Sequence, residues 1–203
     1  LYDRALAADP ANDHAFVNRL ARSSLVCAWA HQSDMLAALR PRVDTALAAP
    51  ESAISLLPLT FTLPYFCSDR TLIHDVCRAI GAHYHQAGRG QKLSRPPAPD
   101  AAEKRLHIGY LSPDFGDHPI SHVTLPIYGL HDREGFRISC YATLDRSAAG
   151  GRYLERIRSH ADAFVDLSGA SHADAAQRIA DDGVDILVDM GGYMRHSRPQ
   201  VLA

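Results

Sequence analysis

The chain has 203 residues, of which 46% are hydrophobic and 22% are charged, a balance typical of a globular protein with a sizeable core. Its formal net charge of −2 gives no electrostatic reason to expect nucleic acid or an anionic membrane as a partner. No apolar run approaches the roughly 20 residues that a membrane-spanning helix needs. The four cysteines form no closely spaced pair, which favours reduced thiols and a cytoplasmic protein.

Residues 1–87 carry helical patterns. The segment 1–13 opens with "LYDRALAADPAN", whose small and apolar residues have helical spacing and which stops at Asp9-Pro10. This ending resembles the last helix of a tetratricopeptide repeat. Because the chain starts inside this pattern and stops after "RPQVLA" without a closing element, we expect both ends to be cuts within a longer protein.

Residues 14–87 are predicted to form a helical connector. In 24–49 the pattern predicts a helical stretch that Pro41 breaks or kinks. "RTLIHDVCRAIGAHYHQAG" predicts a further helix that ends at Gly88. The residues expected on the inner face of the first stretch are Leu25, Trp29, Met35, Leu36, Leu39, Val43 and Leu47.

The segment 88–104, "GRGQKLSRPPAPDAAEK", is rich in Gly, Pro and charge and is predicted to be an exposed linker. After it the pattern changes. Strand-like runs at 106–111, 137–142, 163–168 and 184–190 alternate with helical segments at about 122–131, 151–161 and 171–183. Alternation at this spacing predicts a parallel sheet covered by helices, so 105–203 is expected to be most of a Rossmann-like α/β domain.

Two polar loops follow predicted strands, at 112–122 and 190–200, where an open parallel sheet binds ligands. In the first loop, His118 is placed to act as a general base, although an exposed loop histidine is the ordinary alternative. His122 is expected at a helix start, donating to a backbone carbonyl or to a phosphate. A metal held by the two histidines is disfavoured because Pro119 lies between them and no carboxylate completes a ligand set, so we expect no metal.

The other polar residues of these loops leave alternatives open. Asp114 and Asp117 are expected to form turns. Asp189 is a candidate crevice residue, whereas Asp185 is expected to be paired or at a sheet edge. Gly191 and Gly192 would let the backbone approach a ligand, or simply make a tight turn. Arg195 and Arg198 could hold phosphate, with a solvated loop as the default. The motifs for dinucleotides, P-loop phosphates and hydrolase nucleophiles are missing.

At "RLHIGYLSPDFGDHPISH" the chain resembles the catalytic region of the O-linked N-acetylglucosamine transferases, as a bacterial-type member. The resemblance continues through "FRISCYAT", "AFVDLS" and "AAQRIADDGVDILVDMGGYMRHSRPQVLA". Upstream and more weakly, "SLVCAWAHQSDML" is similar to the Cys-x-Trp helix that follows the repeats of this family. The resemblance implies the N-terminal Rossmann-like lobe of a GT-B glycosyltransferase, preceded by a helical connector and the tail of a repeat array.

The resemblance also implies an activity, the inverting transfer of N-acetylglucosamine from UDP-N-acetylglucosamine to Ser or Thr hydroxyls of proteins that the repeats bind. No metal or other cofactor is implied. His118 would be the base or a contact to acceptor and donor phosphate, with the donor's own phosphate as the alternative base. Asp182 and Asp185 would lie near the same site. The donor-base and lysine sites would lie on a C-terminal lobe outside this sequence. The residues expected to bind substrate or donor phosphate are His122, Pro119, Asp182, Asp185, Gly191 and Gly192.

Three alternatives stay open. The fucose-transferring branch of the same family uses GDP-fucose, but it usually lacks the "HPISH" wording that this chain keeps in Pro119 and His122. A non-catalytic protein-binding module would pair the repeat tail with an inactive α/β domain. A flavodoxin-like domain with another ligand would show no activity that depends on His118.

Overall fold

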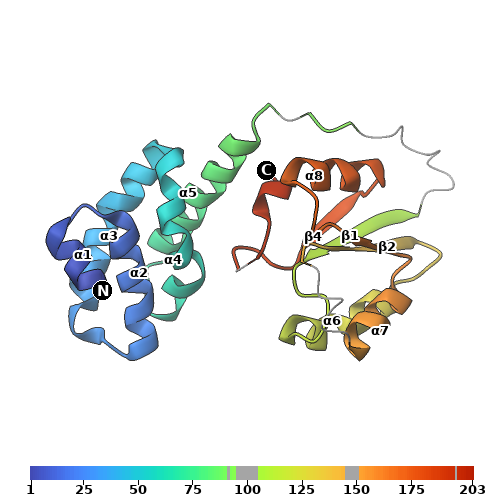
Figure 1. Ribbon diagram of the computed structural model, residues 1–203, viewed down its shortest axis with the longest axis horizontal. Coiled ribbons are helices and arrows are strands. Elements are labelled where there is room, and N and C mark those ends of the chain that lie inside the picture. Colours follow the sequence, from blue (N-terminus) through green and yellow to red (C-terminus); the bar gives the residue numbers. More distant parts are fainter. Residues whose placement is uncertain (91, 95–104, 145–150, 195) are drawn as a thin grey trace. The chain divides into compact units, whose positions relative to one another are not determined.

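The computed structural model describes residues 1–90, 92–94, 105–144, 151–194 and 196–203 (Figure 1). The contacts divide the chain into two compact units, one of Leu1–Arg89 with Ala203 and one of Gly90–Leu202. Residues 91 and 95–104, which include most of the predicted linker 88–104, lie outside the described residues.

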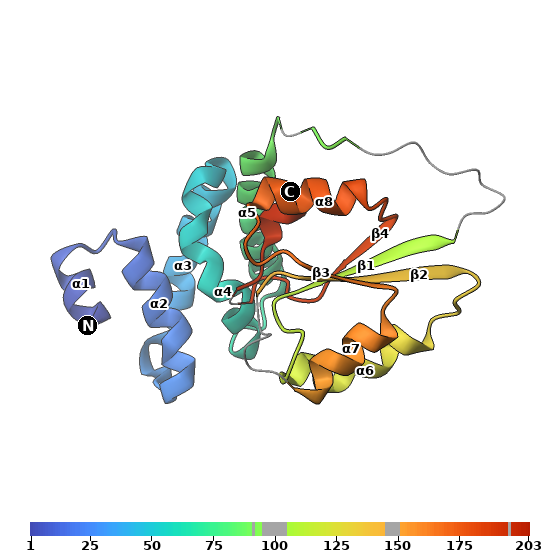
Figure 2. The ribbon, with the colours of Figure 1, turned by 45° about the vertical axis from the view of Figure 1, so that its right-hand side comes forward.

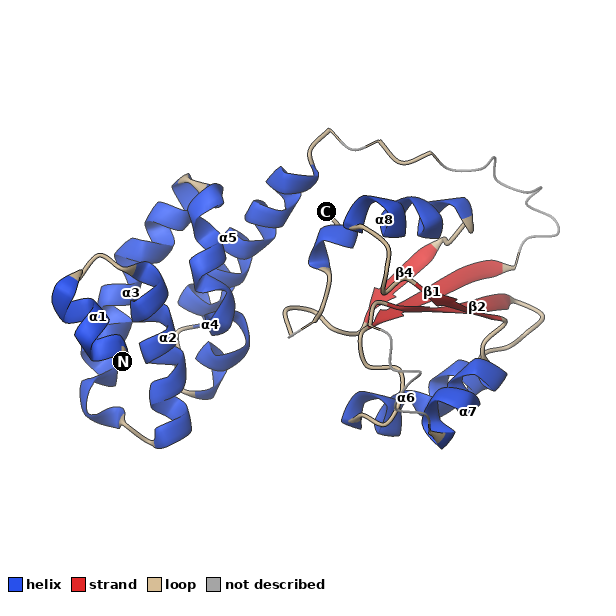
Figure 3. Ribbon diagram, viewed as in Figure 1, coloured by secondary structure: helices blue, strands red, loops and turns tan. Residues whose placement is uncertain are grey.

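The first unit is helical throughout (Figure 3). Its longest helix, α5, is the predicted one and ends at Gly88, and the Asp69 carboxylate caps its start by accepting from the Leu72 N–H at 3.0 Å. Fully buried aliphatic side chains from α2, α3 and α5 form the core. The helices are α1 (Tyr2–Ala8), α2 (Asp13–Ser23), α3 (Gln32–Ala48), α4 (Leu57–Thr62) and α5 (Arg70–Gly88), with 3₁₀ turns at Ser24–Val26, Trp29–His31, Pro50–Leu56 and Leu63–Tyr65.

One expectation for this unit is wrong. Leu25 and Trp29 were expected on an inner face, but they are 71% and 50% exposed. They lie in 3₁₀ turns on either side of Cys27, whose φ of +54° interrupts any helix there. Of the two effects expected of Pro41, the break does not occur, because α3 runs through Pro41 to Ala48, and the kink stays a prediction. Met35, Leu39 and Val43 are buried as expected.

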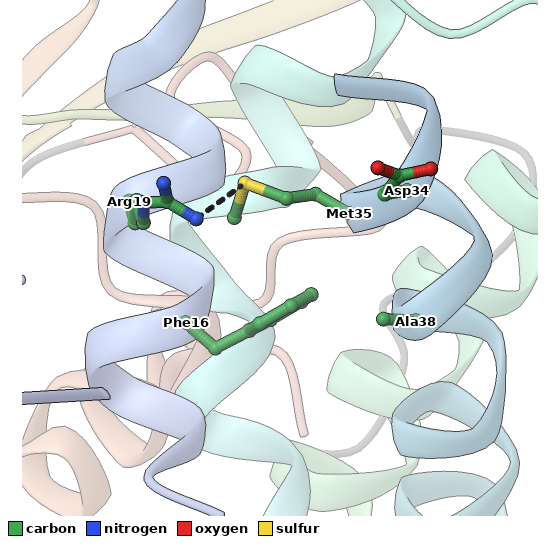
Figure 4. Close-up of a pocket in the computed structure, with 5 residues that line it drawn as sticks. All are labelled: Phe16, Arg19, Asp34, Met35 and Ala38. Atoms are coloured by element: carbon green, nitrogen blue, oxygen red, sulfur yellow. Dashed lines mark hydrogen bonds between the residues drawn. The ribbon is translucent and has the colours of Figure 1, made fainter. Parts of the chain in front are cut away.

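A hollow of about 320 Å³ opens between α2 and α3 (Figure 4). The Arg19 guanidinium reaches across it to within 3.5 Å of the Met35 sulfur and also pairs with Asp3 at 2.6 Å. The arginine in this hollow therefore already has a protein partner, and we assign the hollow no chemistry. Its lining residues are Phe16, Arg19, Asp34, Met35 and Ala38.

The second unit is an α/β domain whose described strands form one parallel sheet in the order β3-β2-β1-β4. Helices α6 and α7 cover one face and α8 covers the other (Figure 2). This confirms the predicted Rossmann-like architecture. The strands are β1 (Leu106–Ser112), β2 (Phe136–Ala142), β3 (Ala163–Asp166) and β4 (Ile186–Asp189), and the helices are α6 (Pro119–Leu130), α7 (Arg152–His160) and α8 (His172–Asp181).

Alternate side chains of the strands feed two separate cores, one on each face of the sheet. Ile108, Ile138 and Cys140 pack with α6 and α7, while Leu111 and Tyr141 pack with α8. Helix α8 begins where the sequence predicts, with the Ser171 hydroxyl accepting from the Asp174 N–H at 3.1 Å. It is followed by Gly183 at a φ of +71°.

Candidate functional site at the carboxyl ends of the strands

The loops after β1 and β4 lie side by side at the carboxyl edge of the sheet. Leu111 pairs with Asp189, and the Met190 N–H donates to the Leu111 carbonyl at 2.9 Å. A Cβ on Gly191 would lie 3.4 Å from Pro113 Cδ. The structure therefore brings together the two polar loops that the sequence predicted at one edge, which is where ligands bind in an open parallel sheet.

The β1–α6 loop is held by a buried network of hydrogen bonds. The Ser121 hydroxyl donates to the Asp114 carbonyl at 2.7 Å and accepts from the Gly116 N–H at 3.2 Å. The Ser112 hydroxyl accepts from the Asp114 N–H at 3.0 Å. Both serines are almost completely buried. Sequence reasoning gave Ser121 no role, although its hydroxyl bridges two backbone groups of the loop that carries His118.

His118 is the N-cap of α6, and each of its ring nitrogens faces a protein group. Its Nδ1 accepts from the Ile120 N–H at 3.3 Å, so the neutral ring carries its proton on Nε2. That nitrogen faces Asp114 Oδ1 at 3.6 Å, and the Asp114 carboxylate is itself buried. Any action of His118 as a base requires the contact with the Ile120 N–H to open, because the lone pair of the neutral ring lies on Nδ1. The sequence treated Asp114 only as a turn former and missed this pairing.

The helix after this loop begins three residues earlier than the predicted 122. Pro119 occupies its first position, where the missing N–H costs nothing and the fixed φ suits a helix. His122 consequently lies inside the first turns of α6. Its Nε2 bonds the Asp117 carboxylate at 2.7 Å and not a backbone carbonyl, and the alternative of a phosphate contact stays a prediction. The two histidines thus face different carboxylates, and no three metal-ligating side chains converge anywhere in the described part of the chain.

In the β4 loop, Asp189 shapes the backbone. Its carboxylate accepts from the Gly191 N–H at 3.0 Å and from the Gly192 N–H at 2.9 Å. Gly192 has a φ of +51°, a conformation that favours glycine. The Gly-Gly pair therefore makes the tight turn, and its approach to a ligand stays a prediction. The carboxylate of Asp189, the predicted crevice residue, stabilises that turn.

Arg198 is occupied by protein partners. Its guanidinium donates to the carbonyls of Leu167 and Ala170 at 2.9 and 2.8 Å. It also donates to His172 Nδ1 at 3.0 Å. Arg198 therefore ties the C-terminal loop to the loop before α8, in place of the phosphate role that was considered. Arg195, the other candidate, lies outside the described residues.

Asp182 and Asp185 lie at the opposite edge of the sheet from His118. The Asp185 carboxylate accepts from the His107 N–H at 3.0 Å, at the start of β1. Asp182 accepts from the Tyr141 hydroxyl at 2.9 Å and from Arg178. Since β1 runs five residues from His107 to Ser112, the two edges are about 16 Å apart. The expectation that these aspartates lie near His118 is therefore not met. Asp185 is paired, as its position in the sequence suggested.

His107 is buried between these groups and should make stability depend on pH. Its Nδ1–H donates to the Asp182 carbonyl at 3.0 Å, and its Nε2 accepts from the Ser139 hydroxyl at 2.7 Å. Burial, and secondly the charge of Arg137, lower the pKa of His107 below its usual 6.5. Between the folded and unfolded pKa values the unfolded chain binds more protons, so this contribution to stability is present above about pH 6.5 and lost as pH falls.

We expect the urea midpoint of unfolding to drop between about pH 7.5 and about pH 5.5. We expect a smaller drop in the His107→Asn variant, which cannot titrate there. An equal drop in the two proteins would show that other groups cause the acid sensitivity.

The fold and its two polar loops identify the class of this domain. It is a Rossmann-like α/β domain with a candidate ligand-binding edge at the carboxyl ends of its strands. Residues 86–203 match the family described as Glycosyl transferase family 41. The chain belongs to this family.

The names of two similar proteins agree with this family. The chain is 30% identical over 185 residues to a probable UDP-N-acetylglucosamine–peptide N-acetylglucosaminyltransferase SEC of Arabidopsis thaliana, covering 88% of this chain and 18% of that protein. It is 40% identical over 101 residues to the UDP-N-acetylglucosamine–peptide N-acetylglucosaminyltransferase of Caenorhabditis elegans, covering 49% of this chain and 9% of that protein. The chain thus spans less than a fifth of the length of these two relatives.

A solved structure shares the fold. It is a mutant O-GlcNAc transferase of Thermobaculum terrenum, with a TM-score of 0.61 and 23% identity, and the match covers 98% of this chain and 36% of that one. No helix among the described residues has the length and apolar character needed to cross a bilayer.

Proposed function

We propose that this chain is part of a protein O-glycosyltransferase that transfers N-acetylglucosamine from UDP-N-acetylglucosamine to Ser or Thr hydroxyls with inversion. The observation that carries the proposal is the family match over 86–203, which includes the whole α/β domain described here. The names printed for the two relatives support the donor and the peptide acceptor. In the complete protein this domain would supply the acceptor side of the site, facing a second lobe.

In the proposed reaction an acceptor hydroxyl attacks the anomeric carbon, and UDP leaves with the bonding electron pair. The attacking oxygen must lose its proton to a base, either His118 or a phosphate oxygen of the donor. The contacts of His118 bear on this choice because Nδ1, which carries the lone pair of the neutral ring, already accepts from the Ile120 N–H. We propose that the His118 ring caps the start of α6 at the crevice and accepts the acceptor's proton on Nδ1 when its contact with the Ile120 N–H opens.

The remaining features of the proposal follow from the family resemblance. The leaving diphosphate would be stabilised by N–H donors and basic groups without a metal ion, so an excess of a chelator should leave the rate unchanged. Pro119, Gly191 and Gly192 would contact the substrate or the donor phosphate in the crevice. The repeat array, of which α1 is the expected end, would bind the protein acceptor. The free thiols of Cys27, Cys67, Cys77 and Cys140 support a cytoplasmic location.

Release of nucleoside diphosphate by the complete protein tests the proposal. UDP-N-acetylglucosamine and GDP-fucose are compared, each with and without a Ser/Thr peptide. We expect UDP release that the peptide accelerates and no GDP release. GDP release alone would place the protein in the fucose-transferring branch, and no release from either donor would favour the binding-module alternative.

A further inference from the structure

Four side chains at the starts of α6 and α7 make a connected cluster. The His122 ring stacks on the Tyr153 ring, with centroids 4.2 Å apart and planes at 27°. On its other side, His122 Nε2 bonds Asp117 Oδ1 at 2.7 Å. The Arg152 guanidinium lies 5.1 Å from the Tyr153 ring centroid. The cluster therefore runs from the residue just before His118 to the first turn of α7.

The members of this cluster differ in how firmly they are anchored. Tyr153 is partly buried and packs against the core formed by the sheet, α6 and α7. The side chains of His122 and Asp117 are 43% and 73% exposed. An exposed carboxylate–imidazole pair gains little by itself, since solvent screens it and ordering its side chains costs entropy. Stacking on the anchored Tyr153 ring is what holds the His122–Asp117 pair in a fixed position.

The cluster also joins two loops at the ligand edge. Asp117 ends the β1–α6 loop, and Arg152 follows the loop from β2 to α7. Helices α6 and α7 lie next to each other on the same face of the sheet (Figure 2). At their other ends the helices approach closely, because a Cβ on Gly129 would lie 3.2 Å from His160 Nδ1. The Tyr153–His122 stack is the corresponding contact at the end that faces the crevice.

We propose that Tyr153 is a positioning residue for His118. Through His122 and Asp117 it holds the end of the β1–α6 loop in the conformation in which the His118 ring caps α6 and faces Asp114. The structural half of this inference stands on the contacts alone. Its consequence for turnover rests on the proposed function.

The structural half is tested by hydrogen exchange of the Ile120 amide in the 203-residue chain, because that N–H donates to the His118 ring. In Tyr153→Ala we expect Ile120 to exchange at least about fivefold faster, with a comparable change in His122→Ala. The double variant should exchange no faster than either single one, since both remove the same link. Tyr153→Phe keeps the stack and should restore slow exchange.

The control is Arg158→Ala. Arg158 covers the Phe164 ring at 4.8 Å near the other end of α7, so its loss perturbs the same helix away from the crevice. Ile120 exchange should stay at the wild-type rate in this variant. An unchanged Ile120 rate in Tyr153→Ala would overturn the inference. So would an equal acceleration in Arg158→Ala, because it would show a general loosening of α7.

The functional half is tested in the complete protein by UDP release. Tyr153→Ala should lower kcat about tenfold, since small misplacements of a positioned group have effects of this size. Tyr153→Phe and Arg158→Ala should stay within about twofold of wild type. If the wild type turns over and Tyr153→Ala has the same kcat, the inference is overturned. Absence of turnover in the wild type would overturn the proposed function and leave the exchange result to decide the inference.

Discussion

Replacing His118 by alanine is expected to lower UDP release by the complete protein at least about a hundredfold, the effect of losing a positioned acid, base or polar contact. The same change should lower the free energy of unfolding by about 1 kcal/mol, because the Ile120 N–H loses its cap. Release is measured with saturating donor and peptide, and stability by urea unfolding of the same preparation. Wild-type release by His118→Ala would contradict any role of this residue in the reaction.

The His118→Asn variant separates the two roles of the ring. Asparagine is a strong N-cap, so it should keep α6 as stable as in the wild type while removing the imidazole. We therefore expect His118→Asn to unfold like the wild type and to release UDP as slowly as His118→Ala. Recovery of release in His118→Asn would mean that the ring serves only as a cap. Asp185→Asn is the matched control, since Asp185 lies at the other edge of the sheet and should leave release per folded molecule within about threefold.

Replacing Gly191 by alanine is expected to distort the mouth of the site. The new Cβ would lie 2.3 Å from Ser197 Oγ and 3.1 Å from Ser197 Cβ, distances that force one of the loop segments to move. Such overpacking costs about 1–3 kcal/mol of stability. Because Gly191 also lies against Pro113 in the loop of His118, we expect UDP release to fall at least about tenfold.

A second change should relieve this clash. The Ser197 hydroxyl is buried and has no hydrogen-bond partner among the described residues, so its removal breaks no bond. Ser197→Gly combined with Gly191→Ala should recover most of the lost stability and release, while Ser197→Gly alone should change release little. If the double variant is no better than Gly191→Ala, the steric explanation is wrong and the effect must come from the backbone of the β4 loop.

The architecture of the α/β domain was predictable because short stretches of sequence mark its strands and the limits of its helices. The alternation in "RLHIGYL" and "FRISCYA" marks strands whose two faces feed different cores, and Ser171 with Gly183 marks the limits of α8. The edge location of the two loops then follows from the parallel order of the strands. The same reasoning could have placed Asp185, because a residue that precedes β4 must lie at the amino edge, away from His118. The family resemblance placed it wrongly.

Other features depend on three-dimensional contacts that no window of sequence contains. The helix was predicted from about residue 122, whereas it starts at Pro119, which fits the first helical position once His118 provides the cap. Trp29 had helical spacing, but the backbone at Cys27 leaves the helical region. The stack of His122 on Tyr153 joins residues 31 positions apart, and only the packing of α6 against α7 shows it.

The measurement that tests the central claim most directly is product analysis of a complete reaction. The full protein is incubated with UDP-N-acetylglucosamine and a Ser/Thr peptide, and the modified peptide and the free UDP are quantified together. The account predicts one N-acetylglucosamine on a Ser or Thr hydroxyl for each UDP released, in the β-configuration that inversion gives, and neither product above background in His118→Asn. UDP without glycosylated peptide, or a peptide modified only when GDP-fucose is the donor, would contradict it.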